Sequence, residues 1–109
     1  VTGGQVALLA EAGLLDVTVV SSGDNQPVRF TPAGRRIAGN IGESFQTTNS
    51  TQFYRANTAL PAEVWAGTDT AAPIVARRVG LGWVILMGMD YYESNEQTQK
   101  LLLHAVTYR

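Results

Sequence analysis

The sequence predicts a single α/β domain, in which helices flank a mixed sheet with a central β-hairpin at about residues 74–88. The length of 109 residues suits one domain, and 45% apolar with 16% charged residues suits a globular core. Two apolar, β-branched runs meet at Gly80-Leu81-Gly82, which is typical of a hairpin. Segments rich in helix formers lie near both ends of the chain.

The N-terminal third alternates helical and extended segments. Residues 5–12 predict a short helix that ends at Gly13, a residue suited to the left-handed conformation after a helix. The valine-rich residues 16–21 predict a strand. A turn follows at residues 22–27, and then a brief extended stretch at residues 28–30. Thr31-Pro32 resembles the start of a second helix, through Ile37 and ending at Gly39.

The middle of the chain is its most polar part. Residues 46–52 carry no charge and no helical periodicity, so we expect an exposed loop or a pair of edge strands there. Phe45, Phe53 and Tyr54 flank this stretch as its large apolar anchors. The sequence Asn49-Ser50-Thr51 also fits the acceptor pattern for N-glycosylation, which depends on a glycosylating cell.

The last third has the clearest pattern. Residues 63–66 and 74–79 predict strands, and residues 83–89 predict a central strand because their apolar run requires cover on both faces. Ser94 and Gln97 predict a capping box for a final helix over residues 95–108. We expect Leu102, Ala105 and Val106 to share the apolar face of that helix, with His104 projecting away from it.

Composition excludes several classes of function. The chain has no cysteine, which removes disulfides, thiolate metal sites and cysteine nucleophiles. A net charge of −1 provides no general attraction to nucleic acid. The longest apolar run is about half as long as a bilayer-spanning helix, so we expect no membrane insertion. We find no cofactor-binding motif and no catalytic triad, and we expect no enzymatic activity and no cofactor.

Two groups of residues are candidate sites. Three carboxylates could hold a hard cation after the 83–89 strand, although they also suit the N-terminus of the following helix; they are Asp90, Glu93 and Glu96. Three aromatic side chains could contact a carbohydrate or a protein, although aromatic residues of small domains commonly belong to the core; they are Trp83, Tyr91 and Tyr92. Arg77 and Arg78 are adjacent on a strand, so they face opposite ways and form no common patch.

Several motifs resemble those of a known family. They are Val1-Thr2-Gly3-Gly4, Ala72-Pro73-Ile74-Val75-Ala76-Arg77, Val79-Gly80-Leu81-Gly82-Trp83-Val84, Met87-Gly88-Met89-Asp90 and Leu102-Leu103-His104-Ala105-Val106. Together they resemble the C-terminal half of a class I glutamine-amidotransferase-like, flavodoxin-like domain, in the non-catalytic branch found in bacterial surface and secreted proteins. Trp83 stands where that branch has Arg, and His104 where it has Asn. The resemblance is strongest over residues 72–109, and it implies a fragment or trimmed version of a larger domain.

We therefore expect a non-catalytic structural or interaction domain of an extracellular or cell-surface protein. It would assemble with itself or with the rest of its parent protein by pairing of sheet edges. The expected contact residues are Phe45, Phe53, Tyr54, Thr48 and Ser50. The alternatives are a module that binds carbohydrate or another ligand, and a degenerate fragment of an amidotransferase-like enzyme.

Overall fold

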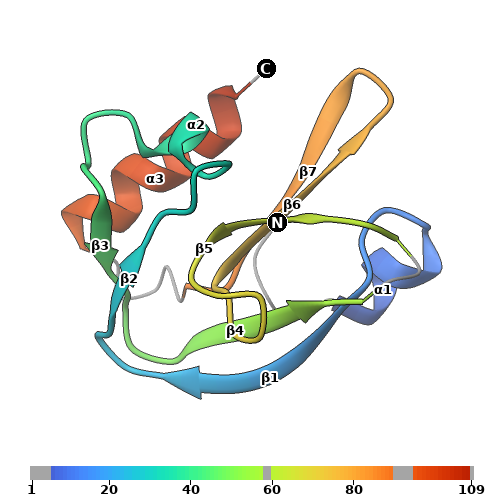
Figure 1. Ribbon diagram of the computed structural model, residues 1–109, viewed down its shortest axis with the longest axis horizontal. Coiled ribbons are helices and arrows are strands. Elements are labelled where there is room, and N and C mark those ends of the chain that lie inside the picture. Colours follow the sequence, from blue (N-terminus) through green and yellow to red (C-terminus); the bar gives the residue numbers. More distant parts are fainter. Residues whose placement is uncertain (1–5, 58–59, 90–94, 109) are drawn as a thin grey trace.

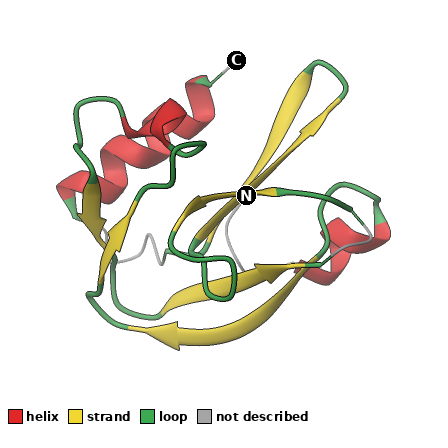
Figure 2. Cartoon of the chain, in the orientation of Figure 1, coloured by secondary structure: helices red, strands yellow, loops and turns green. Residues whose placement is uncertain are grey.

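A three-stranded antiparallel sheet lies at the centre of the computed structural model, which describes residues 6–57, 60–89 and 95–108 (Figure 1). Its strands run in the order β5-β6-β7, and two-stranded sheets β1-β4 and β2-β3 accompany it (Figure 2). The elements are α1 (Val6–Glu11), β1 (Val17–Gly23), β2 (Pro27–Arg29), α2 (Arg35–Ala38), β3 (Ser44–Gln46), β4 (Thr51–Ala56), β5 (Glu63–Ala66), β6 (Ile74–Val79), β7 (Gly82–Met87) and α3 (Glu96–Thr107).

The central sheet confirms the strands at 63–66 and 74–79 and the hairpin between β6 and β7. Val79 pairs with Gly82, so Gly80 and Leu81 alone form the connection, and Gly80 has a φ of 59°. The prediction that residues 83–89 form the central strand is wrong, because β6 is the middle strand of the described sheet. Both β6 and β7 are apolar, and the apolar pattern does not distinguish a strand between two neighbours from one beside a single neighbour.

Both faces of this sheet are covered by apolar cores, as the unbroken apolar run predicts. Successive side chains of a strand point to opposite faces. Ile74, Ala76 and Met87 therefore pack into a core with Leu101 of α3, whereas Val75 and Leu86 pack into a second core on the other face. The second core also contains side chains from the N-terminal region and β4: Leu9, Leu15, Val17 and Tyr54.

Strand β4 contributes to both cores. It pairs with β1 in an antiparallel ribbon, whose register shifts between Val19 and Ser21. It also contacts the central sheet, where Tyr54 and Ala72 exchange backbone hydrogen bonds of 2.7 and 2.9 Å. Phe53 of β4 belongs to the core that contacts α3, and the next residue, Tyr54, belongs to the other core.

The helices differ from the expectations mainly at their N-termini. Helix α1 is followed by Gly13 with a φ of 71°, as expected. Thr31 forms the cap-type bond that the sequence predicts, since its hydroxyl accepts from Gly34 N and its carbonyl accepts from Arg35 N. Residues 32–34 form a turn, and α2 itself starts at Arg35. The Thr31 hydroxyl also donates to Val64 O of β5. The capping box of α3 is formed by Asn95 and Thr98. Gln97, expected in that role, accepts a hydrogen bond from Gln46 N, and Ser94 lies outside the described residues.

Of the two alternatives expected for the polar middle segment, an exposed loop is wrong, whereas strands are present at both of its ends, where β3 ends at Gln46 and β4 begins at Thr51. Phe45, Phe53, Tyr54 and Thr48 are all at most 6% exposed, and Thr47 and Thr51 are also buried. Hydrogen bonds satisfy these hydroxyls: Gln26 N donates to Thr47 Oγ1, and Thr51 Oγ1 donates to Thr48 O. Uncharged polar residues thus line the interior here, since their short side chains find backbone partners.

The prediction of a mixed sheet is wrong. Every pairing between the named strands of the described part is antiparallel. The architecture is a compact mixed α/β fold with small antiparallel sheets and few helices. Within the described residues, no helix combines the length and apolar character needed to cross a membrane.

Candidate functional site

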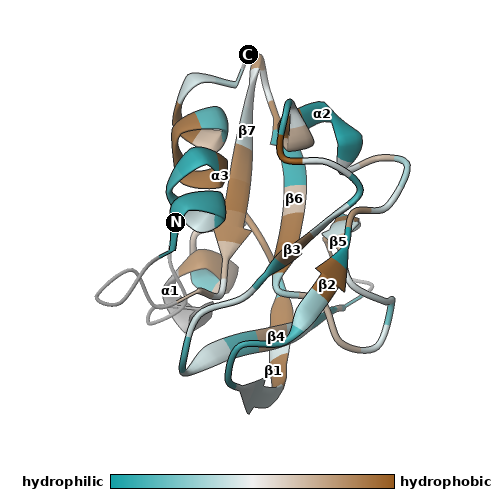
Figure 3. Ribbon diagram, turned by 90° about the vertical axis from the view of Figure 1, so that its left-hand side faces the viewer, coloured by the Kyte–Doolittle hydropathy of each residue, from teal (hydrophilic) through white to brown (hydrophobic). Residues whose placement is uncertain are grey.

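An apolar groove lies along β7 between the N-terminal region and α3. Its volume is about 230 Å³, and its described lining is formed by Leu9, Leu14, Trp83, Val84, Ile85, Met87, Leu102, Ala105 and Val106. The lining arises because the final turns of α3 present apolar side chains beside an apolar strand. Figure 3 shows α3 alongside β7, which is hydrophobic over most of its length.

Exposed apolar side chains extend this groove onto the surface of α3. Val106 is 75% exposed and Leu103 is 60% exposed. Residues three apart on a helix are neighbours, so these two form one strip next to the groove. Leu102, Ala105 and Val106 line the groove together, as their expected common apolar face predicts. The fully buried residues of α3 are Leu101 and Thr98.

The β6–β7 hairpin presents a further exposed apolar residue. β5 pairs with β6 only as far as Ala76, so the tip of the hairpin extends past β5 (Figure 1). Leu81 lies at this tip and is 97% exposed. Isolated exposed leucines are common, but one placed on a projecting hairpin is accessible to a partner from several directions.

Trp83 lies within an aromatic cluster and also lines the groove along β7. Its ring centroid is 5.2 Å from that of Trp65 and 5.8 Å from that of Tyr108. The guanidinium carbon of Arg36 lies 5.2 Å from the Trp83 centroid, a cation–π distance. These neighbours explain Trp83 as a packing residue, and they leave less of its ring surface for stacking on a sugar.

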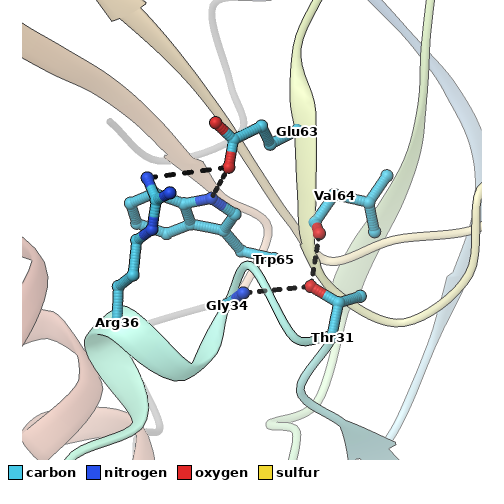
Figure 4. Close-up of polar contacts among 6 residues, drawn as sticks. All are labelled: Thr31, Gly34, Arg36, Glu63, Val64 and Trp65. Atoms are coloured by element: carbon cyan, nitrogen blue, oxygen red, sulfur yellow. Dashed lines mark hydrogen bonds and ion pairs between the residues drawn. The ribbon is translucent and has the colours of Figure 1, made fainter.

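Glu63 connects this cluster to α2 and β5, as Figure 4 shows. Its carboxylate lies 3.8 Å from Arg36 and accepts a hydrogen bond of 3.2 Å from Trp65 Nε1. Trp65 itself is fully buried, so this bond satisfies its indole N–H. Nearby, the hydroxyl of Thr31 bridges Gly34 N at 3.0 Å and Val64 O at 2.6 Å.

A second, polar pocket lies between α2 and α3. It has a volume of about 300 Å³ and is lined by Arg36, Gly39, His104, Thr107 and Tyr108. His104 contacts the end of α2, where its Nδ1 lies 2.7 Å from Ile37 O. Because a carbonyl only accepts, Nδ1 carries the proton of this bond.

A third depression combines hydroxyl and amide side chains with apolar ones. Its volume is about 480 Å³, and it lies between the end of β1, β2 and the loop after β5. Ser21, Ser22, Gln26, Arg29 and Thr68 provide polar groups, and Phe53 contributes an aromatic surface. No local motif predicts this depression or the polar pocket, because each is formed by residues from distant parts of the chain.

The carboxylates proposed for a cation are only partly within the described structure. Asp90 and Glu93 lie outside the described residues, as do Tyr91 and Tyr92. The Glu96 carboxylate is 84% exposed and lies 3.4 Å from Lys100 Nζ. Among the described residues, no group of three or more metal-ligating side chains is brought together.

The proposed contact residues are divided between interior and surface. Of the five, only Ser50 is exposed, with a φ of 58° and its backbone N–H donating to Asp24 Oδ1. Asn49 of the glycosylation pattern is exposed, and its side chain accepts from Asn25 Nδ2 at 2.7 Å. The two arginines of β6 behave as expected: Arg77 donates to Gly13 O and Leu14 O, whereas Arg78 is exposed.

Comparison with protein-family models, curated proteins and solved structures finds no match to this chain.

Proposed function

We propose that this chain is a non-catalytic structural and interaction domain of an extracellular or cell-surface protein, and that it assembles with a second copy of itself. The observation that carries the proposal is the apolar surface formed by the groove along β7 and by Leu103 and Val106 of α3. Large exposed apolar patches mark interaction sites on soluble proteins. A second copy is the one partner certain to be present wherever the chain occurs.

The position of this surface differs from the position expected from the sequence. Phe45, Phe53 and Tyr54 are buried within the chain, so they stabilise its own cores and are not available to a partner. The exposed apolar residues instead lie on α3 and on the hairpin tip. The proposed contact therefore includes α3, the groove along β7 and Leu81.

The non-catalytic assignment rests on the residues available for chemistry. The chain contains no cysteine and a single histidine, and that histidine bonds to the Ile37 carbonyl. A nucleophile activated by a general base needs the two groups within hydrogen-bond reach, with the base oriented for proton transfer. The resemblance to the non-catalytic branch of amidotransferase-like domains rests on the β6–β7 and α3 segments, and it supplies the proposed extracellular location.

Light scattering coupled to size-exclusion chromatography tests the assembly. We expect the chain to form dimers that the double variant L103K/V106K dissociates. Burying one such side chain contributes about 1.5–3 kcal/mol, so the double variant weakens the dimer by on the order of 100-fold or more. Both positions are exposed in the single chain, so the variant should fold normally.

Val20→Lys serves as the matched control. Val20 is an exposed apolar residue of β1 at 39%, and it does not line the groove. We expect V20K to leave the dimer intact. A folded wild-type chain that remains monomeric at the highest soluble concentration contradicts the proposal, as does equal dissociation by V20K and L103K/V106K.

A second candidate function is carbohydrate binding, which the depression lined by Ser21, Ser22, Gln26 and Thr68 favours. Hydroxyl and amide side chains both donate and accept hydrogen bonds, which suits them to the hydroxyl groups of a neutral sugar. Titration with neutral oligosaccharides should shift the amide resonances of Ser22 and Thr68 to saturation. Unchanged spectra over the panel would remove this candidate.

A further inference from the structure

We propose that the pocket between α2 and α3 binds a tetrahedral oxyanion, the phosphate or sulfate group of a small molecule. Its volume of about 300 Å³ exceeds what one such group needs, so part of the attached molecule also fits. Its lining includes Arg36 and His104, together with Thr107, whose hydroxyl donates to Leu103 O, and Tyr108. This set of groups is suited to oxygen-rich anions, because guanidinium and imidazolium both donate charge-assisted hydrogen bonds.

Arg36 is held in position before any ligand binds. Its guanidinium lies over the Trp83 ring at 5.2 Å and lies 3.8 Å from the Glu63 carboxylate. A guanidinium has five N–H donors, and Glu63 faces only the NH1 end at this distance. Stacking and ion pairing reduce the side-chain entropy that Arg36 loses when it binds an anion.

His104 is held in position by the backbone of α2. Its Nδ1–H donates to Ile37 O at 2.7 Å, which leaves Nε2 as the nitrogen available to a ligand. The neutral ring accepts from the P–OH group of a phosphate, and the protonated ring donates to an unprotonated oxygen. One ring can therefore serve the oxyanion in either protonation state.

Gly39 makes this position of His104 possible. A Cβ at residue 39 would lie 2.6 Å from His104 Cε1, and the φ of 54° is a conformation that other residues rarely adopt. The glycine that ends α2 thus allows the imidazole to lie against the backbone. This contact and the Ile37 bond hold the imidazole at a fixed place in the pocket lining.

The charges around the pocket predict how variants change the affinity. Arg36 from α2 attracts the anion, and Glu63 from β5 opposes it; Lys100, one turn before His104 on α3, pairs with Glu96. We expect Arg36→Gln to weaken binding by on the order of tenfold or more, because a charge-assisted bond is lost. We expect Glu63→Gln to tighten binding by about two- to fivefold, because it retains an oxygen for Trp65 Nε1 but removes the opposing charge.

Nuclear magnetic resonance provides a direct assay, since His104 is the only histidine and its ring signal is unambiguous. Inorganic phosphate, sulfate and acetate are titrated separately into the full chain. We expect saturable shifts of the His104 ring and the Trp83 indole with phosphate or sulfate, and weaker binding of acetate.

Arg78→Gln is the control, because Arg78 is exposed on the hairpin and does not line the pocket. The proposal is overturned by linear, non-saturating shifts with every anion, or by equal affinities of wild type, R36Q and R78Q. It is also overturned if E63Q binds no more tightly than wild type. The dimer is tested separately by L103K/V106K, because neither Leu103 nor Val106 lines this pocket.

Discussion

The Gly34→Ala substitution has two opposing effects on stability. One comes from the backbone conformation of residue 34, and the other from the space available for a side chain there. Gly34 has a φ of −75° and a ψ of −10°, a right-handed helical conformation that alanine adopts readily. Backbone preference alone therefore predicts a gain of about 0.5–1 kcal/mol for alanine. The space around Gly34 predicts the opposite, because a Cβ there would lie 1.6 Å from Trp65 O and 2.5 Å from Trp65 C.

The cost follows from the neighbours that must move. Relieving the overlap displaces either β5 or the turn before α2, and the two are joined by bonds from Thr31 N to Trp65 O and from the Thr31 hydroxyl to Val64 O. Each lost bond costs about 1 kcal/mol. Loosened packing of the fully buried Trp65 adds about 1–3 kcal/mol. After the backbone gain is subtracted, we expect a net destabilisation of about 2–4 kcal/mol.

Chemical denaturation followed by circular dichroism measures this difference. For a domain of this size the expected loss lowers the melting temperature by about 10–20 °C. Gly82→Ala is the matched control, since the nearest neighbour of a Cβ there is Val79 O at 4.0 Å, and it should change stability by less than about 0.5 kcal/mol. A G34A protein as stable as wild type would refute the expectation that steric overlap with Trp65 outweighs the backbone gain.

Three further predictions concern other parts of the fold. Burial raises the pKa of Tyr54 to about 12, so the free energy of unfolding should fall by up to about 3 kcal/mol as pH rises from 10 to 12, and Y54F should abolish this loss in urea titrations at high pH. At the hairpin, Gly80→Val should cost about 1–2 kcal/mol because of the positive φ, whereas Gly82→Val should be almost neutral; equal melting temperatures would argue against this turn. Amide hydrogen exchange should be slowest in residues 74–76 and 85–87, which lie between the two cores, and fast at the hairpin tip; similar rates in both would contradict the layered arrangement.

The parts of the fold that the sequence predicted are those with local signals. The β6–β7 hairpin combines two apolar runs with a glycine-containing turn, and its strand boundaries at residues 74–79 are confirmed. The end of α1 at Gly13 follows from the same kind of signal. In each case the determining residues lie within a few positions of one another, so a pattern along the chain contains the information.

The errors arise where a partner distant in sequence determines the structure. Thr31 forms the predicted cap-type bond to Gly34 N, but its second bond, to Val64 O thirty-three positions away, has no local signal. Thr47 is buried because Gln26 N satisfies its hydroxyl, twenty-one positions away. The polar pocket likewise joins Arg36 to His104 and Tyr108. No periodicity or motif encodes such pairs, so only the folded structure reveals them.

Strand β4 joins the two hydrophobic cores, so neither core can open without displacing this strand. Adjacent residues of this one strand, Phe53 and Tyr54, enter different cores, and the same strand bonds to Ala72 and Gly88 at the base of the central sheet. Lifting β4 would therefore open both cores to water in the same event. Melting should accordingly be all-or-none, with calorimetric and van't Hoff enthalpies that agree.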